Sequence, residues 1–194
     1  MSISPRVKVI DVTLLSDNWY ILRKARFNFQ RADGSWQEQV REVYDRGNGA
    51  CILLYNVARR TIILTKQFRY PAFANGHDDL LIEVPAGLLD NLDPEACIKK
   101  ETEEETGFRI GAVQKIFEAF MSPGSVTEKL HFFAAPYAAR DRVSQGGGHE
   151  HEGEDIAVLE VPFDEAMAMI ADGRIKDAKT IMLLQHAALT LFKV

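Results

Sequence analysis

The stretch that decides the fold is Gly87-Leu-Leu-Asp-Asn-Leu-Asp-Pro-Glu-Ala-Cys-Ile-Lys-Lys-Glu-Thr-Glu-Glu-Glu-Thr-Gly107-Phe108. The pair Asp93-Pro94 is typical of a helix start, with the aspartate as N-cap and the proline in the first turn. We expect the helix to continue to about residue 106, because Gly107 suits the left-handed conformation that often ends a helix. The sequence therefore predicts one helix in the middle of the chain.

Three carboxylates would gather on one face of this helix, because Glu101, Glu104 and Glu105 are three and four residues apart. Each ionised carboxylate makes it harder to ionise its neighbours, and Lys100 offsets only part of this through a contact with Glu104 one turn away. A hard divalent cation would offset the rest, and oxygen ligands such as the Ala86 carbonyl suit Mg²⁺ or Mn²⁺. The alternative is a solvated acidic helix face that binds no metal.

The elements around this helix are mostly strands. Runs of β-branched and aromatic residues predict strands at 7–12, 19–29, 36–44, 50–57, 61–68, 80–84 (an apolar run interrupted by Glu83), 112–120, 130–135 and 156–162. The runs 50–57 and 61–68 read as a hairpin, and helices are expected at 163–171 and 178–192. This order favours an α+β fold, a mixed sheet with helices packed on it, over a regular doubly wound fold.

Composition and charge narrow the classes of function. The chain has 194 residues, 46% of them apolar, and a net charge of −5, which argues against sequence-independent binding to nucleic acid. Cys51 and Cys97 are isolated and predict buried, reduced thiols. We find neither a secretory signal pattern nor an apolar run long enough to cross a membrane, so the expected location is the cytoplasm.

The deciding stretch resembles the Nudix box, Gly-x5-Glu-x7-Arg-Glu-U-x-Glu-Glu-x-Gly-U, where U is aliphatic or aromatic. Over residues 100–108 the match is close, with Lys100 in place of the arginine and Thr102 in place of an aliphatic residue. The front half is one residue short, which puts Leu92 where the first glutamate should be, with Asp90 and Asp93 on either side. We assign no role to that first position.

The resemblance extends over almost the whole chain to the GDP-mannose pyrophosphatase branch, a close relative of the ADP-ribose pyrophosphatases. The segments that carry it are Ser16-Asp17-Asn18-Trp19, Arg41-Glu42-Val43-Tyr44-Asp45-Arg46-Gly47-Asn48-Gly49, Lys66-Gln67-Phe68-Arg69, Val84-Pro85-Ala86-Gly87-Leu88-Leu89-Asp90-Asn91 and Met121-Ser122-Pro123-Gly124. The resemblance implies a homodimeric α/β/α sandwich of the Nudix fold. Residues 1–45 would be an N-terminal antiparallel β extension that exchanges between subunits, and residues 46–194 the catalytic domain.

The resemblance also implies an activity and a set of site residues. The activity is Mg²⁺-dependent hydrolysis of GDP-mannose to GMP and mannose 1-phosphate. The implied metal ligands are the Ala86 carbonyl, Glu101, Glu104, Glu105 and Glu154, and the implied catalytic residues are Glu104, Glu105 and Glu154. The implied substrate contacts are Trp19, Val40, Arg41, Glu42, Arg69, Ala86, Gly87, Leu88, Glu105, Glu128, Gly153, Glu154 and Lys179. Within that set, Arg69 suits a bidentate grip on phosphate, Arg41 suits contact with the base, and Trp19 would reach the partner subunit's ligand.

The general base is expected in the Gly- and His-rich loop at residues 146–155, which offers Glu150, Glu152 and Glu154. Glu154 fits best, because the strand that directly follows can hold it within reach of a water molecule. His149 and His151 are weak evidence for a zinc site, and we interpret the loop as a flexible, solvated lid.

Two alternatives to a GDP-mannose hydrolase stay open. One is a hydrolase of ADP-ribose or another nucleoside-diphosphate sugar, which would differ in its base-reading residues. The other is a non-catalytic nucleotide-binding module on the same fold, and the intact triplet Glu101, Glu104 and Glu105 favours an enzyme over it. The number of metal ions is not determined by the sequence.

Overall fold

The computed structural model describes residues 2–149, 151 and 153–193. These residues form two compact units. Unit 1 takes in the chain up to Asn48 together with Phe120–Lys129, and unit 2 takes in Gly49–Ala119 and the chain from Leu130 onward. Each unit is described separately below.

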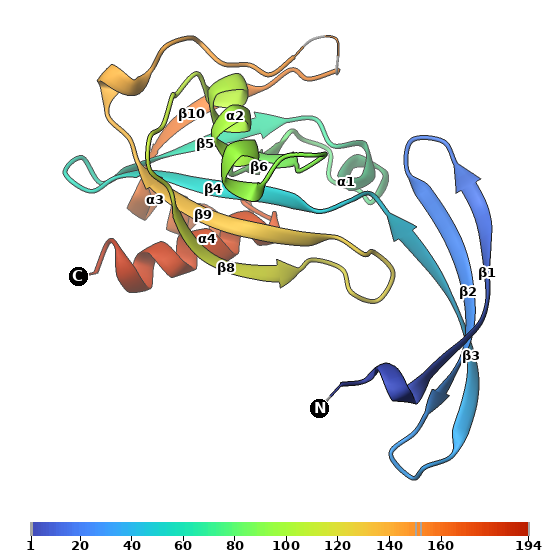
Figure 1. Cartoon of the computed structure of the whole chain (residues 1–194). Coiled ribbons are helices and arrows are strands. Elements are labelled where there is room, and N and C mark those ends of the chain that lie inside the picture. The colour runs from blue at the N-terminus through green and yellow to red at the C-terminus, as the bar shows by residue number, and fades with distance from the viewer. Residues whose placement is uncertain (1, 150, 152, 194) are drawn as a thin grey trace. The chain divides into compact units, whose positions relative to one another are not determined.

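Unit 1 is built on a three-stranded antiparallel sheet in the order β1-β2-β3 (Figure 1). Its elements are the 3-10 turn η1 (Ser4–Arg6), β1 (Val7–Asp17), β2 (Ile21–Gln30) and β3 (Trp36–Asp45). The predicted N-terminal antiparallel extension is thus confirmed. The first strand runs five residues further than predicted, to Asp17, and the prediction of Trp19 within a strand was wrong, because the chain bends there between β1 and β2.

The sheet of unit 1 has little core of its own. Among the residues described in this unit, none is fully buried. Large apolar side chains stand open on β1, where Val9 is 65% exposed, Val12 51% and Leu14 56%. A sheet that leaves such residues on its surface needs a covering partner, since burying apolar area is the main favourable term in folding.

Unit 2 holds a mixed sheet in the order β10-β5-β4-β9-β8, with β6 beside β5 and β7 beside β4. Its strands are β4 (Gly49–Asn56), β5 (Thr61–Gln67), β6 (Leu81–Glu83), β7 (Ala86–Leu88), β8 (Gln114–Phe120), β9 (Lys129–Pro136) and β10 (Ala157–Pro162). The central strand β4 runs antiparallel to β5 and β7 and parallel to β9. The expected hairpin and mixed sheet are therefore confirmed.

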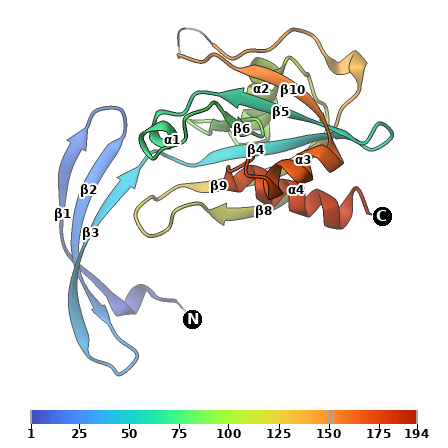
Figure 2. The same ribbon diagram turned by 180° about the vertical axis from the view of Figure 1, so that it is seen from behind.

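Helices cover both faces of this sheet, as Figures 1 and 2 show, so unit 2 is an α/β/α sandwich. The helices are α1 (Tyr70–Ala74), α2 (Pro94–Thr106), η2 (Ala139–Asp141), α3 (Phe163–Ala171) and α4 (Ala178–Thr190). α2 lies on one face, over β4, β5 and β7, while α3 and α4 lie on the other. Ile98 of α2 packs with Ile52 and Leu54 of β4. Cys51 and Cys97 are buried thiols, as predicted.

The local signals at α2 behave as the sequence predicts. The Asp93 carboxylate accepts the backbone N–H groups of Glu95 and Ala96 at 3.0 and 3.1 Å, which satisfies two N–H groups of the first turn. Gly107 ends the helix with φ +76°, and the carbonyl of Ser144 leaves no room there for a side chain. The short elements α1 and β7 were not predicted. β7 is a strand because its backbone pairs with that of β4.

Candidate active site

Glu105 is the most buried carboxylate of the predicted triplet, with 2% of its surface exposed. It points from the last turn of α2 toward β7, where the Ala86 N–H donates to its Oε2 at 3.2 Å. Burial raises the pKa of Glu105 to about 8, and the negative charges of Glu101 and Glu154 contribute to the rise while the Ala86 N–H opposes it. A buried carboxyl group surrounded by other carboxylates favours the approach of a cation.

Glu101 lies one turn earlier on α2, beside the backbone of β7. A Cβ atom on Gly87 would overlap the Glu101 carboxyl group, so this close approach requires glycine. The ammonium of Lys100 is 3.8 Å from Glu101. The strand β7 therefore brings both Glu101 and Glu105 against one short piece of backbone, Ala86 and Gly87.

Glu104 faces a different set of partners. Its Oε2 accepts from Lys100 at 2.7 Å, the i, i+4 contact predicted from the sequence, and its Oε1 is 3.0 Å from His149 Nε2. Partial burial works against ionisation, but the hydrogen bonds from Lys100 and His149 hold the pKa of Glu104 below its usual value. Glu104 is thus ionised and already paired.

The Gly-rich loop is packed on the C-terminal end of α2, so the described part of it is not the solvated lid that we predicted. The N–H groups of Gly147 and Gly148 donate to the carbonyls of Glu105 and Glu104 at 2.9 and 3.1 Å. These bonds satisfy carbonyls that a helix end leaves open. Gly146, Gly147 and Gly148 all have positive φ angles, which explains the run of glycines.

The same loop places Glu154 at the site. Its Oε2 accepts the N–H of His149 at 2.9 Å, and its charge contributes to the raised pKa of Glu105. Gly153, beside it, lies in a turn with φ +76°. The other two candidate bases, Glu150 and Glu152, lie outside the described residues. The structure therefore brings Glu101, Glu105 and Glu154 near one another from two separate segments.

These carboxylates are the type of ligand that a hard divalent cation prefers, but their side chains are not arranged around a common point in this structure. Among residues 2–149, 151 and 153–193, no three Asp, Glu, His or Cys side chains are grouped so as to hold a metal ion. The donor set is nonetheless all oxygen, and the buried Glu105 carboxyl lies near the charges of Glu101 and Glu154, so a divalent cation would stabilise its ionised form. The chemistry of these residues therefore fits such an ion.

A second group of charges lies at the end of β5. Arg69 follows β5 and begins α1, and its Nε donates to Glu83 Oε2 at 2.8 Å. The other oxygen of Glu83 accepts from Lys179 at 2.5 Å, and Lys179 is also 3.1 Å from Asp177. Sequence reasoning missed Glu83, although a glutamate that interrupts a buried apolar strand is itself a signal of a buried ion pair.

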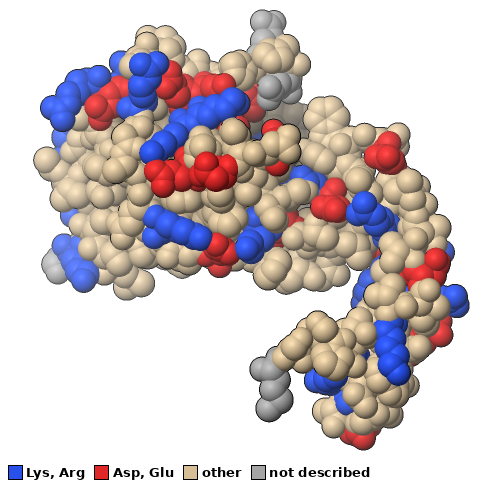
Figure 3. All heavy atoms as spheres, viewed as in Figure 1, with Lys and Arg blue, Asp and Glu red and all other residues tan. Residues whose placement is uncertain are grey.

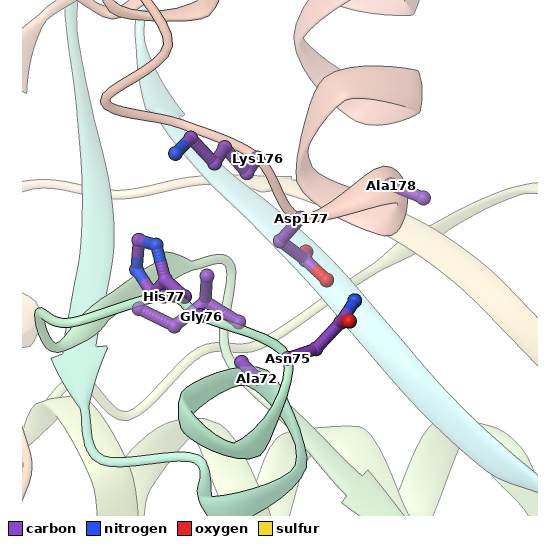
Figure 4. Close-up of a pocket in the computed structure, with 8 residues that line it drawn as sticks. Ala72, Asn75, Gly76, His77, Lys176, Asp177 and Ala178 are labelled. Carbon is purple, nitrogen blue, oxygen red and sulfur yellow. The ribbon is translucent and has the colours of Figure 1, made fainter.

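A cavity of about 350 Å³ lies beside Asp177 at the start of α4 (Figure 4). It is lined by Ala72, Asn75, Gly76, His77, Leu81, Lys176, Asp177 and Ala178. Asp177 and Asn75 point toward one another across it in Figure 4. None of the predicted carboxylate ligands of α2 lines this cavity, so it is separate from the acidic cluster.

The remaining predicted contacts, apart from Leu88 at the end of β7, are on unit 1. Trp19 is 80% exposed, and Arg41 lies on β3 between Val40 and Glu42. Arg41 also lines a mostly apolar cavity of about 720 Å³ within this unit. Glu128 is 3.5 Å from the guanidinium of Arg46. These residues of unit 1 could contact a ligand. The acidic cluster of Glu101, Glu105 and Glu154, in contrast, lies entirely in unit 2.

Acidic and basic side chains lie interspersed over the face of unit 2 seen in Figure 3. Positive charge for a phosphate group would therefore come from individual residues on this face.

None of the helices in the described residues has the length and apolar character needed to cross a bilayer.

Comparison with known proteins agrees with this architecture. The model described as the NUDIX domain matches residues 45–184, and the model described as the GDP-mannose pyrophosphatase NudK N-terminal domain matches residues 6–44. The chain therefore belongs to the NUDIX hydrolase family, and the resemblance seen in its central helix is confirmed. Enzymes of this family generally use divalent metal ions.

Three relatives of this chain carry one name. Proteins named GDP-mannose pyrophosphatase are similar to it in Pectobacterium atrosepticum (57% identity, 95% of each chain), Klebsiella pneumoniae (53%, 94% of this chain and 92% of the relative) and Yersinia pestis (52%, 97% and 95%). A solved structure of an ADP compounds hydrolase superposes with a TM-score of 0.73 at 14% identity and covers 97% of each chain. That structure supports the fold.

Proposed function

We propose that this chain hydrolyses the pyrophosphate bond of GDP-mannose to GMP and mannose 1-phosphate, in the presence of Mg²⁺. The observation that carries the proposal is the buried carboxyl of Glu105 beside Glu101 and Glu154, because a bound cation would favour the ionised form of such a cluster. The substrate follows from the relatives named GDP-mannose pyrophosphatase, which are 52–57% identical to this chain.

In this proposal the Ala86 carbonyl, Glu101, Glu104, Glu105 and Glu154 would hold the metal. When bound, Mg²⁺ supplies charge neutralisation at the bridging phosphates and lowers the pKa of a water molecule. All five donors are oxygen atoms, the ligand type that Mg²⁺ prefers. Glu104 joins the set by giving up its contacts with Lys100 and His149.

The chain's own residues carry the remaining chemistry. One water is consumed, so a new P–O bond forms on one phosphorus while the bridging oxygen leaves with the other phosphate. Glu154 accepts the proton of the attacking water, since the His149 N–H holds its carboxylate in place. Arg69 binds a phosphate through the guanidinium nitrogens that Glu83 does not occupy.

The acidic helix offers a matched pair of variants to test this role. Glu105→Gln should lower kcat by orders of magnitude while far-UV circular dichroism stays unchanged. Glu103→Gln, the same substitution on the same helix, removes only a contact with Arg109 and should retain nearly full activity. Equal activity of Glu105→Gln and the wild type would overturn the assignment of the site.

The substrate is tested separately from the chemistry. With Mg²⁺ present, GDP-mannose and ADP-ribose are compared at equal concentration, and the nucleotide products are identified by chromatography. We expect GMP from GDP-mannose and a higher kcat/KM for this substrate. Arg41→Ala should bring the kcat/KM values for GDP-mannose and ADP-ribose closer together, because we assign contact with the base to this part of β3. A higher kcat/KM for ADP-ribose would retain the chemistry and reject the substrate.

We further propose that a second copy of the chain covers the exposed sheet of unit 1. Support comes from Val9, Val12 and Leu14, which are exposed on β1 although a stable sheet buries such residues. Sedimentation equilibrium should give a dimer for the wild type, and Val12→Glu should shift it toward monomer. A wild type that stays monomeric at all concentrations would contradict this.

A further inference from the structure

Two cations that we assign to the substrate side of unit 2 share one buried carboxylate. Glu83 is 3% exposed, and its two oxygens accept separately from Arg69 at 2.8 Å and from Lys179 at 2.5 Å. Burial alone would raise the pKa of Glu83, yet the ammonium of Lys179 and the guanidinium of Arg69 hold it lower. Glu83 is therefore an ionised bridge between two cations.

Glu83 also joins three elements that meet at this place. It lies at the end of β6, Arg69 follows β5, and Lys179 is in the first turn of α4. Next to it, the Val84 N–H donates to the Thr180 hydroxyl of α4 at 2.8 Å, which fixes β6 against that helix. The backbone beside Glu83 is thus held by a contact that does not depend on the two cations.

We propose that Glu83 is a positioning residue that aligns Arg69 for the diphosphate of the substrate. The inference rests on the proposed function, because it assumes that Arg69 binds phosphate. Glu83 takes only the Nε of Arg69, so the terminal nitrogens of that guanidinium stay available for a bidentate contact. A fixed guanidinium binds phosphate with less loss of side-chain freedom than a mobile one.

The charge balance explains why a carboxylate is needed there. Arg69 and Lys179 carry like charges. Burial and the charge of Arg69 both act to lower the pKa of Lys179, but Glu83 and Asp177 raise it overall. Glu83 offsets that repulsion from between them, and Asp177 offsets it from the far side of Lys179. An uncharged residue at position 83 would leave the buried Lys179 and the half-exposed Arg69 close together without the carboxylate between them. Arg69, whose side chain is 40% exposed, is then free to turn away.

The test measures how tightly the protein binds inorganic pyrophosphate, by calorimetry without metal, together with KM and kcat for GDP-mannose in Mg²⁺. Glu83→Gln should weaken pyrophosphate binding and raise KM roughly 10- to 100-fold, with a smaller effect on kcat. In an Arg69→Ala background the same substitution should change neither quantity further, because Glu83 acts through Arg69. Full additivity of the two substitutions would overturn the proposal.

A control and a second variant separate positioning from stability. Glu160 also pairs with an arginine, Arg59, but lies opposite Ile63 of β5, about 20 Å along the strand from Arg69, so Glu160→Gln should leave binding unchanged. If Glu83→Gln does not fold, the double variant Glu83→Gln/Lys179→Met removes the buried ammonium of Lys179, which would otherwise retain only Asp177 as a partner. That variant should fold and still bind pyrophosphate weakly, and wild-type affinity in it would overturn the proposal.

The pyrophosphate measurement also distinguishes the two levels of inference. A wild type that binds pyrophosphate but leaves GDP-mannose intact would reject the proposed function. The role of Glu83 would then still be tested by the difference in pyrophosphate affinity between the wild type and Glu83→Gln. A wild type that hydrolyses GDP-mannose, with Glu83→Gln at the same KM, would retain the function and reject the role of Glu83.

Discussion

Glu105→Gln should stabilise the metal-free protein at alkaline pH while it abolishes activity. Glu105 is buried, and its pKa is raised from 4.5 to about 8. The folded state therefore holds a proton that the unfolded state has lost across this range, and the free energy of unfolding falls as pH rises from 4.5 to about 8. A glutamine keeps the acceptor for the Ala86 N–H and has no proton to lose.

The size of the effect follows from the same shift. Each tenfold change in proton affinity is worth about 1.4 kcal/mol. A pKa raised from 4.5 to about 8 therefore lowers the free energy of unfolding by at most roughly 5 kcal/mol at pH values above the raised pKa. Relaxation and water entry around a buried charge reduce this, and we expect a gain of roughly 2–5 kcal/mol for the variant. Below pH 4.5 Glu105 is protonated in both the folded and the unfolded state, so the stabilisation by Glu105→Gln should vanish.

The assay is urea unfolding in a chelator, at about pH 5 and about pH 9, for the wild type, Glu105→Gln and Glu103→Gln. Glu103 is exposed and its pKa is lowered by Arg109, so its variant should show no such gain at alkaline pH. Added Mg²⁺ should stabilise the wild type more than Glu105→Gln. The reasoning is refuted if the gain for Glu105→Gln is the same at both pH values.

Three further substitutions test local features of α2. Gly87→Ala should lower kcat strongly with little loss of helix content, because the new Cβ overlaps the Glu101 carboxyl; unchanged kcat would show that Glu101 has room to move. Asp93→Ala should lower the free energy of unfolding by about 1 kcal/mol in urea titrations, since it removes the N-cap. Gly107→Ala should cost roughly 1–3 kcal/mol in the same assay, because φ is +76° and the Ser144 carbonyl is close, and no loss would contradict that strain.

Much of the fold could be read from local chemistry. Asp93-Pro94 and Gly107 act within a single turn of chain, so the limits of α2 could be predicted closely. Runs of β-branched and aromatic residues identified most strands of unit 2 in the same way. The short elements α1 and β7 could not be found, because β7 is a strand only through its pairing with β4, a contact made at long range.

The site could be predicted in part for the same reason. A spacing of three and four residues brings Glu101, Glu104 and Glu105 to one side of a helix, whatever surrounds it. Their different surroundings depend on other segments: β7 encloses Glu105, while the Gly-rich loop brings His149 to Glu104. The bridge at Glu83 joins residues from β6 and α4 that are far apart in the chain, and no local pattern reveals such a pair.

The loop Phe120–Lys129 belongs to unit 1 although the chain on both sides of it belongs to unit 2. Within unit 1, Tyr44 donates to the Ser125 carbonyl at 2.8 Å and accepts from the Thr127 N–H at 3.0 Å. The N-terminal extension is therefore not a segment that can be removed or transferred by itself, because the loop is part of the same unit. A graft of the first 48 residues onto another hydrolase of this family would have to carry the loop as well, or leave the backbone of Tyr44 without these partners.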